Sequence, residues 1–195
     1  MFRLAPGETR AAWENFLTRL YRRGLQGREL RLITTDGGGG VIAGVEAAYP
    51  HVARQRCWFH KMQNVSARLC KKDRSQVLDG LRGVYSAPTR RAAVRAYHAW
   101  ARRCHARYPA VVECVDRDRQ ELLAVFDVPA AHRRMVRTTN GIERCFREVR
   151  RRTRSIGTFV NDASIERIVY GLVAYHNRKY ATRICRELKQ LGQVA

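Results

Sequence analysis

Acidic side chains are scarce in this chain of 195 residues. It has 17 Asp and Glu against 38 Lys and Arg, so the formal net charge is +21 and the isoelectric point lies near 10.9. A charge this one-sided indicates a polyanionic partner. Because the excess is mostly Arg, whose planar fork of donors pairs with phosphate oxygens, we expect that partner to be nucleic acid.

Long apolar runs and export features are also absent from the sequence. No apolar run reaches the about 18 residues that span a bilayer, and the N-terminal MFRLAPGETR leads into polar sequence rather than the apolar core of a signal peptide. The six cysteines are widely scattered, so we expect free thiols in a reducing compartment rather than a disulfide framework. Membrane and secreted proteins are thereby excluded, and we expect a cytoplasmic protein that associates with the nucleoid when it binds DNA.

The sequence also has no internal repeats and no change of composition that would mark two separate regions. The only low-complexity tract is Gly37–Gly40, and no linker separates two independent domains. With 45% hydrophobic residues the chain can bury an ordinary core. The length therefore predicts one medium domain, or one domain with a large insertion.

The first third of the chain has the pattern of an α/β protein. Apolar residues recur at helical spacing from Trp13 to Tyr21 and stop before Gly24. The short apolar runs LRLIT (30–34) and ARQRCWFH (53–60) predict strands, and 41–48 between them predicts a helix after a glycine turn.

The remainder of the chain has mainly helical patterns. We expect helices through 61–126, a non-helical stretch over 127–139, and a basic helix over 140–154 that Asn140 caps. A turn and a last amphipathic helix over 163–178 follow. The apolar positions of that last helix are expected to face inward: Ile165, Ile168, Val169, Leu172 and Val173.

Asp36 stands where an apolar strand ends in a glycine loop. A carboxylate there is held rigidly at the open end of a sheet, which suits a ligand of a divalent metal. The alternative is an ordinary Asp-Gly turn. A phosphate-binding loop is disfavoured, because no Gly-Lys-Ser/Thr follows and the glycines do not fit G-x-G-x-x-G.

Cys57 and His60, in CWFH, have a spacing that occurs in zinc sites. A tetrahedral zinc site needs a second pair of ligands, and the other cysteines and histidines form no recognisable one. We therefore do not expect zinc, and packing or local hydrogen bonding remains the alternative to a metal site.

The segment from Arg133 to Arg154 holds a third of the net charge, with nine Arg and two Glu. As a helix it places Ile142 and Phe146 on one apolar stripe toward the core, with Glu143 among cations at the edge of that stripe. This arrangement fits a site that binds a metal through Glu143 and nucleic-acid phosphates through neighbouring arginines. The alternative is an ordinary helix pair between Glu143 and Arg147. The candidate DNA-binding residues are Arg133, Arg134, Arg137, Arg144, Arg147, Arg150, Arg151, Arg152 and Arg154.

Taken together, three ordered segments resemble the Mutator-type transposases of bacterial insertion sequences. They are RGLQGRELRLITTDGGGGVIAGVEAAYP, then QRCWFHKMQNV, then TTNGIERCFREVRRRTRSIGTFVNDASIERIVYGLV. The resemblance implies a partial ribonuclease-H-like fold with a large all-helical insertion and C-terminal helices. Its implied parts are a β/α core over 1–60, the insertion over 61–126, and completion of the core over 127–195.

The resemblance also implies an activity and a set of site residues. Such enzymes cut and join DNA with two Mg²⁺ or Mn²⁺ ions held by two Asp and one Glu. Asp36 matches the second Asp, Glu143 matches the Glu, and Cys57 and His60 match the family's Cys-x-x-His pair. Two cations close together activate the attacking oxygen and stabilise the leaving one. The implied partners are double-stranded DNA, at transposon ends and target, and further copies of the chain or of an intact transposase.

One family residue has no match in this sequence. The first catalytic Asp lies on the family's first strand, upstream of the segment where this sequence begins, and no acid before Asp36 sits in a comparable apolar run. Two carboxylates hold a metal pair poorly, so we expect the chain to be inactive alone. A non-catalytic basic DNA-binding protein is the alternative function.

Overall fold

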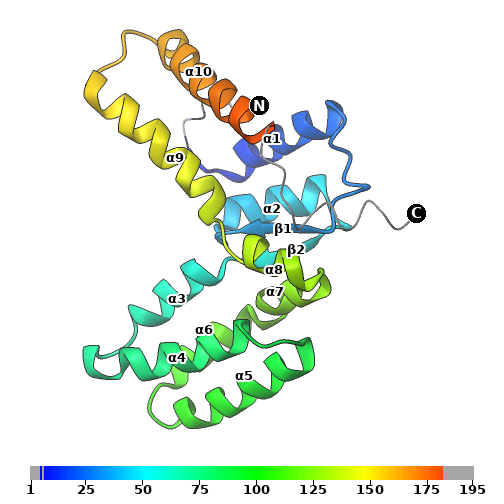
Figure 1. Cartoon of the computed structure of the whole chain (residues 1–195), viewed down its shortest axis with the longest axis vertical. Helices are drawn as coiled ribbons and strands as arrows, with labels where there is room; N and C mark the ends of the chain where they lie inside the picture. Colours follow the sequence, from blue (N-terminus) through cyan, green and yellow to red (C-terminus); the bar gives the residue numbers. More distant parts are fainter. Residues whose placement is uncertain (1–4, 6, 182–195) are drawn as a thin grey trace.

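The computed structural model describes residue 5 and residues 7–181, most of which are helical (Figure 1). A parallel two-stranded sheet lies near the start of the chain. The α-helices and strands of the described residues are α1 Arg10–Arg22, β1 Leu32–Thr35, α2 Gly39–Ala48, β2 Ala53–Arg56, α3 Trp58–Ser66, α4 Arg74–Tyr85, α5 Arg90–His105, α6 Pro109–Arg117, α7 Arg119–Leu123, α8 Ala130–Val136, α9 Asn140–Thr153 and α10 Asp162–Ala181. Short 3₁₀ turns are η1 Lys71–Asp73, η2 Ala124–Asp127 and η3 Arg154–Ile156.

The sheet is formed by a β-α-β unit, as the sequence pattern predicts. β1 pairs with β2 in a register that runs from Leu32 opposite Ala53 to Thr35 opposite Arg56. α2 connects the strands, and α1 packs against α2. At their contact a Cβ on Gly44 would lie 2.8 Å from the Cβ of Trp13, so glycine permits the close approach of the two helices. The α/β class is therefore correct, although helices dominate.

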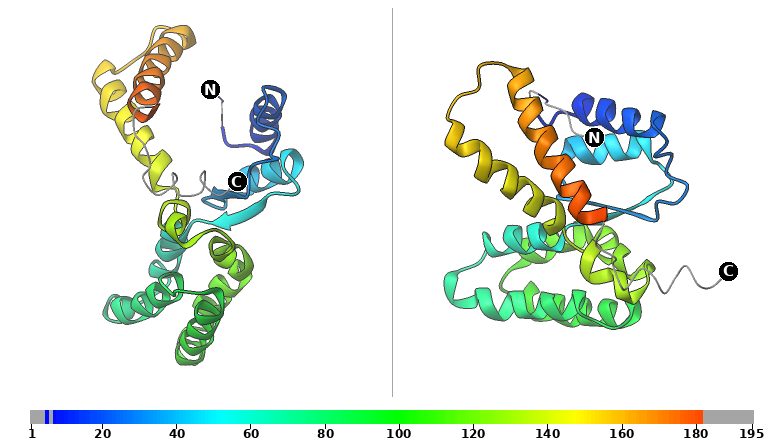
Figure 2. Two further views of the ribbon diagram at one scale, coloured as in Figure 1. Left: turned by 45° about the vertical axis from the view of Figure 1, so that its right-hand side comes forward. Right: turned by 45° about the horizontal axis from the view of Figure 1, so that its top comes forward.

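The hydrophobic core lies mainly in the helices from α3 to η2, and Leu32 of β1 packs against it. Figure 2 shows these helices as one body on one side of the sheet, with α9 and α10 on the other. Two fully buried indoles anchor this core: Trp58 Nε1 donates to the Leu122 carbonyl at 2.9 Å, and Trp100 Nε1 donates to the Val77 carbonyl at 3.0 Å. The predicted helical region over 61–126 is thus confirmed.

Two predicted element boundaries are wrong. The strand expected over 53–60 ends at Arg56, and α3 begins at Trp58. An apolar tetrapeptide such as CWFH fits either element, and the buried contacts of Trp58 with the helical core favour the helix. The stretch 127–139, expected to be non-helical, contains α8, which begins directly after Pro129.

The core-facing prediction for α9 is also wrong. Ile142 is 59% exposed and Phe146 is 53% exposed, because α9 projects from the sheet and α10 packs beside it over only part of its length (Figures 1 and 2). The helix begins after Thr139 rather than after a capping Asn140. The predicted last helix lies within α10, where the apolar positions expected to face inward are half-buried.

Within residue 5 and residues 7–181, the structure contains no helix that is long and apolar enough to cross a membrane.

Tyr97 should make stability depend on alkaline pH. Its hydroxyl donates to Asp116 Oδ1 at 2.8 Å, and burial, followed by this hydrogen bond, raises the pKa of Tyr97 from 10.0 to about 12. A raised folded-state pKa contributes stability that is complete below pH 10 and is lost as pH rises through 12. We expect Tyr97→Phe to cost about 1 kcal/mol at neutral pH. Urea denaturation at successive pH values should show a shallower loss of stability above pH 10 in the variant. Parallel losses would contradict the assignment.

Candidate active site

The candidate site lies at the carboxyl edge of the small sheet. Asp36 follows β1 and Cys57 follows β2, and because the strands are parallel both residues emerge at the same edge. The Cys57 N–H donates to the Thr35 carbonyl at 2.8 Å, which continues the ladder one residue beyond β2. This backbone hydrogen bond therefore holds Thr35, directly before Asp36, beside Cys57.

Asp36 is presented on the surface by a tight turn. Its Oδ1 accepts a hydrogen bond from the Gly38 N–H at 3.0 Å, and Gly37 has a φ of +86°, which favours glycine. The turn that the sequence left as an alternative therefore exists. It orients an exposed carboxylate at the sheet edge and does not bury it.

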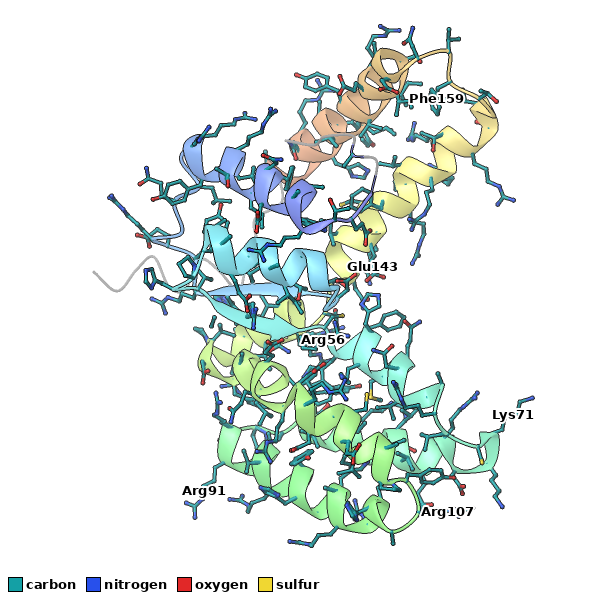
Figure 3. The ribbon with its side chains drawn as sticks, turned by 180° about the vertical axis from the view of Figure 1, so that it is seen from behind. Arg56, Lys71, Arg91, Arg107, Glu143 and Phe159 are labelled. Carbon is teal, nitrogen blue, oxygen red and sulfur yellow. The ribbon has the colours of Figure 1, made fainter. Side chains whose placement is uncertain are left out.

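The segment that leads into α9 is bound to this edge by contacts between distant residues. Thr34 Oγ1 donates to the Val136 carbonyl at 2.5 Å, and the Trp58 N–H donates to the Arg137 carbonyl at 3.1 Å. These bonds bring the turn between α8 and α9 to the ends of both strands. Figure 3 shows Glu143 on the part of α9 nearest to the sheet.

Three side chains, those of Cys57, His60 and Glu143, meet around the hydroxyl of Thr139. Thr139 Oγ1 donates to Glu143 Oε1 at 2.5 Å and lies 3.5 Å from His60 Nδ1. Cys57 Sγ lies 3.3 Å from the Thr139 nitrogen and 3.4 Å from Oγ1. His60 Nε2 is also 3.8 Å from Glu143 Oε1. The structure thus joins the predicted Cys57 and His60 pair to the predicted acid.

Thr139 was not among the predicted site residues. The available signal was its position in TTNGIER, four residues before Glu143, where a threonine that precedes a helix can reach the first turn. The pair expected as the alternative, Glu143 with Arg147, is not formed in the described part of the chain, where Glu143 Oε1 lies beside Thr139 Oγ1 and His60 Nε2 instead. The Cys57 side chain is fully buried, which fits a structural thiol held by Thr139.

The carboxylates of Asp36 and Glu143 are hard oxygen ligands of the kind that Mg²⁺ and Mn²⁺ prefer. Both are partly or fully exposed, and a hydrogen bond from a residue nearby in the sequence orients each of them. Among residue 5 and residues 7–181, however, no three His, Cys, Asp or Glu side chains gather closely enough to bind a metal ion. The donor chemistry therefore fits a divalent cation, but the residues described here do not complete a cage.

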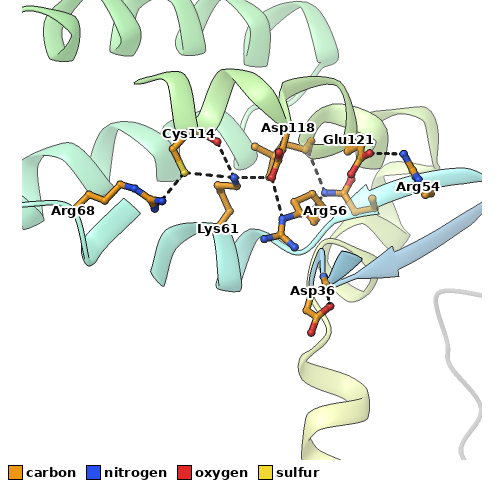
Figure 4. Close-up of polar contacts among 11 residues, drawn as sticks. Asp36, Arg54, Arg56, Lys61, Arg68, Cys114, Asp118 and Glu121 are labelled. Carbon is orange, nitrogen blue, oxygen red and sulfur yellow. Dashed lines mark hydrogen bonds and ion pairs between the residues drawn. The ribbon is translucent and has the colours of Figure 1, made fainter. Parts of the chain in front are cut away.

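A network of ion pairs that contains the buried cations Arg56 and Lys61 lies next to the Asp36 loop, as shown in Figure 4. Asp118 Oδ2 pairs with Lys61 Nζ at 2.6 Å and with Arg56 Nε at 3.1 Å, and Lys61 Nζ also donates to the Cys114 carbonyl at 2.8 Å. The Arg56 guanidinium occupies the space that a side chain on Gly37 would need. Through this contact between Arg56 and Gly37, the network supports the loop that carries Asp36. Sequence reasoning missed it, because no local pattern pairs residues about sixty positions apart.

The predicted basic helix presents its arginines to solvent. Those on α9 are all exposed: Arg144, Arg147, Arg150, Arg151 and Arg152. Arg151 pairs with Glu148, and this contact lowers the pKa of the Glu148 carboxyl. Arg134 and Arg154 are exposed as well.

Two of the predicted DNA-binding arginines make contacts inside the fold. Arg133 donates to the carbonyls of Val128, Pro88 and Phe126, and its guanidinium lies over the Phe126 ring. Arg137 lies over the Tyr85 ring at 4.7 Å. Arg133 is therefore committed to packing, and most of the exposed arginines among the candidates lie on α9.

Comparison with known proteins shows the family of the chain. The model of the family "Transposase, Mutator family" matches residues 1–182, so the chain belongs to the Mutator family of transposases. It is 41% identical to the transposase for insertion sequence element IST2 of Acidithiobacillus ferrooxidans over 75% of this chain and 49% of that protein. It is 38% identical to the transposase for insertion sequence element IS406 of Burkholderia multivorans over 92% of this chain and 46% of that protein. The chain thus spans about half the length of the curated relatives it matches.

Proposed function

We propose that this chain is the C-terminal part of a transposase catalytic domain, which binds double-stranded DNA and takes part in cutting and joining strands at the ends of an insertion sequence. Residues 1–60 and 127–195 are assigned to a partial ribonuclease-H-like core, with the helices of 61–126 as its insertion. Intact transposase copies, or further copies of this chain, are the proposed protein partners.

One observation carries the proposal. Asp36 and the start of the Glu143 helix converge on one sheet edge, through the bonds from Thr35 to Cys57 and from Cys57 to Thr139. From that edge α9 runs outward with exposed arginines along it. This places carboxylates at one end of a cationic helix, which suits an enzyme that holds a phosphodiester backbone beside its reacting groups.

Asp36 and Glu143 are the residues of this chain that would hold a divalent cation, together with a further acid such as the one that the family places on its first strand. When bound, such cations supply Lewis-acid stabilisation of charge on the reacting oxygens. Thr139 and His60 keep Oε1 of Glu143 in one orientation, so the carboxylate is positioned before DNA arrives. The exposed arginines of α9 neutralise the phosphates that flank the reacting one.

A second candidate function is DNA binding without cleavage by this chain alone. It is favoured by the lack of any group of three ligating side chains among residue 5 and residues 7–181. Both candidate functions use the same DNA-binding surface. They differ only in whether other chain segments complete the set of metal-binding carboxylates.

DNA binding by the arginines of α9 should depend steeply on salt. Each phosphate contact contributes a slope of about −0.9 to log K against log salt. Replacing Arg144, Arg147 and Arg150 together by Gln should reduce the slope by up to three such contacts. Fluorescence anisotropy with a short duplex at several salt concentrations measures this, and little sequence preference is expected.

The matched control removes three exposed arginines of α5, namely Arg91, Arg95 and Arg102. Figure 3 shows Arg91 at one end of the molecule and Glu143 near its middle, at the part of α9 nearest to the sheet. The same loss of charge there should leave the slope nearly unchanged. Equal reductions in both triple variants, or a slope near zero in the original chain, would contradict the proposed surface.

A further inference from the structure

A pocket of about 400 Å³ lies beside the candidate active site, between α3, α4 and the turn before α9. Aromatic and apolar side chains line it, among them Phe59, Met62 and Tyr85. Tyr85 packs between Trp58, at a ring distance of 5.2 Å, and the Arg137 guanidinium. Phe59 is 42% exposed, so one aromatic ring remains open to a ligand.

The pocket and the candidate site share their supporting segments. Phe59 in the pocket is followed by His60 in the acid cluster, and the two rings meet edge to face at 5.6 Å. Thr138 and Asn140 line the pocket, and Thr139 between them binds Glu143. On both segments, the residues that line the pocket are therefore sequence neighbours of His60 and Thr139, which contact the Glu143 carboxylate.

We propose that this pocket binds a single unpaired DNA base next to the strand that is cut, an inference that rests on the proposed function. A base has two π-faces that stack on an open aromatic ring, and this stacking tolerates any base. Its edge carries donors and acceptors that the Gln63 and Asn140 amides at the pocket can meet. The Arg137 guanidinium at the pocket wall matches the phosphate that accompanies the base.

The distribution of chemistry favours a base over an apolar small molecule. Two arginines, Arg82 and Arg137, line a pocket that also holds amides and aromatic rings. Arg82 already pairs with Asp79, whereas Arg137 lies over the Tyr85 ring, so a nucleotide phosphate can pair with the Arg137 guanidinium and an apolar ligand cannot. Aromatic stacking beside a cationic wall is the arrangement by which proteins bind unpaired nucleotides. Extrusion of a base costs least where the duplex is already unpaired.

The test compares two short duplexes of the same sequence, one fully paired and one with a single bulged 2-aminopurine. The complete chain is titrated against both, and anisotropy and 2-aminopurine fluorescence are recorded. We expect roughly tenfold tighter binding of the bulged duplex, with quenching of the probe as it stacks. Phe59→Ala should remove most of this preference and the quenching, with unchanged affinity for the paired duplex.

Phe146→Ala is the matched control, because Phe146 is similarly exposed, on α9, and does not line the pocket. It should keep the preference for the bulged duplex. Circular dichroism verifies that both variants fold. Equal affinity of the original chain for both duplexes would contradict base binding by the pocket, and so would an equal loss of the preference in the two variants. Neither outcome would contradict DNA binding by the chain. Failure to bind either duplex overturns the proposed function itself.

Discussion

Glu143→Gln should abolish metal-dependent DNA cleavage in a protein that supplies the preceding half of a longer relative. Joining that half to residues 1–195 is expected to restore Mg²⁺- or Mn²⁺-dependent cleavage at a transposon end. The amide keeps the size of the side chain and removes the anionic ligand, so the rate should fall by about 10³-fold or more. Affinity for DNA should stay nearly unchanged, because the arginine contacts remain. Cleavage of a labelled end, with anisotropy in parallel, measures both.

The control for this prediction lies on the same helix. Glu148 pairs with Arg151 rather than with Thr139 or His60, so Glu148→Gln should have little effect on cleavage. Asp36→Asn should match the loss of Glu143→Gln. Near-normal cleavage by Glu143→Gln, or equal damage from Glu148→Gln, would show that Glu143 is not the metal-binding acid.

Asp118→Asn should destabilise the fold strongly. Asp118 is the anion that pairs with both Lys61, which is 3% exposed, and Arg56, which is 8% exposed. Its loss leaves two buried cations without a carboxylate, and breaking such a pair costs about 3 to 5 kcal/mol. We expect this loss in the free energy of unfolding from urea denaturation at neutral pH.

Two further variants separate the effect of burial on the free energy of unfolding from the effect of losing a charge. Asp79→Asn breaks an exposed pair with Arg82 and should cost well under about 1 kcal/mol. Adding Lys61→Met to Asp118→Asn should recover part of the stability, since it removes one of the uncompensated cations. A loss in Asp118→Asn no larger than that in Asp79→Asn would contradict a stabilising role for the network.

Local patterns were sufficient to predict most elements. Apolar spacing predicted α1, α2 and the helices between α3 and η2, and the glycine run after LRLIT placed Asp36 at the end of a strand. The same kind of pattern placed Glu143 on a basic helix. These features depend on residues near one another in the chain, so the sequence alone suffices for them. The roles of Asp36 and Glu143 stay predictions.

Periodicity identifies the apolar side of a helix but not what covers it. Ile142 and Phe146 form the expected stripe on α9, yet no element within residues 7–181 covers them, and they remain exposed there. The start of α3 was equally ambiguous until the buried contacts of Trp58 were known. The stripe on α9 has no packing partner in the described part of the chain, whereas at α3 packing between distant segments overrides a local preference.

The sequence by itself determined the charge, the β-α-β unit, the arginine helix and the order of the motifs, because each is encoded over a few neighbouring residues. Only the tertiary structure decided which side chains meet. Thr139 joins Cys57 to Glu143 across more than eighty positions, and Asp118 neutralises two cations about sixty positions away. Such contacts arise from chain closure around a shared core, and no spacing along the sequence encodes them.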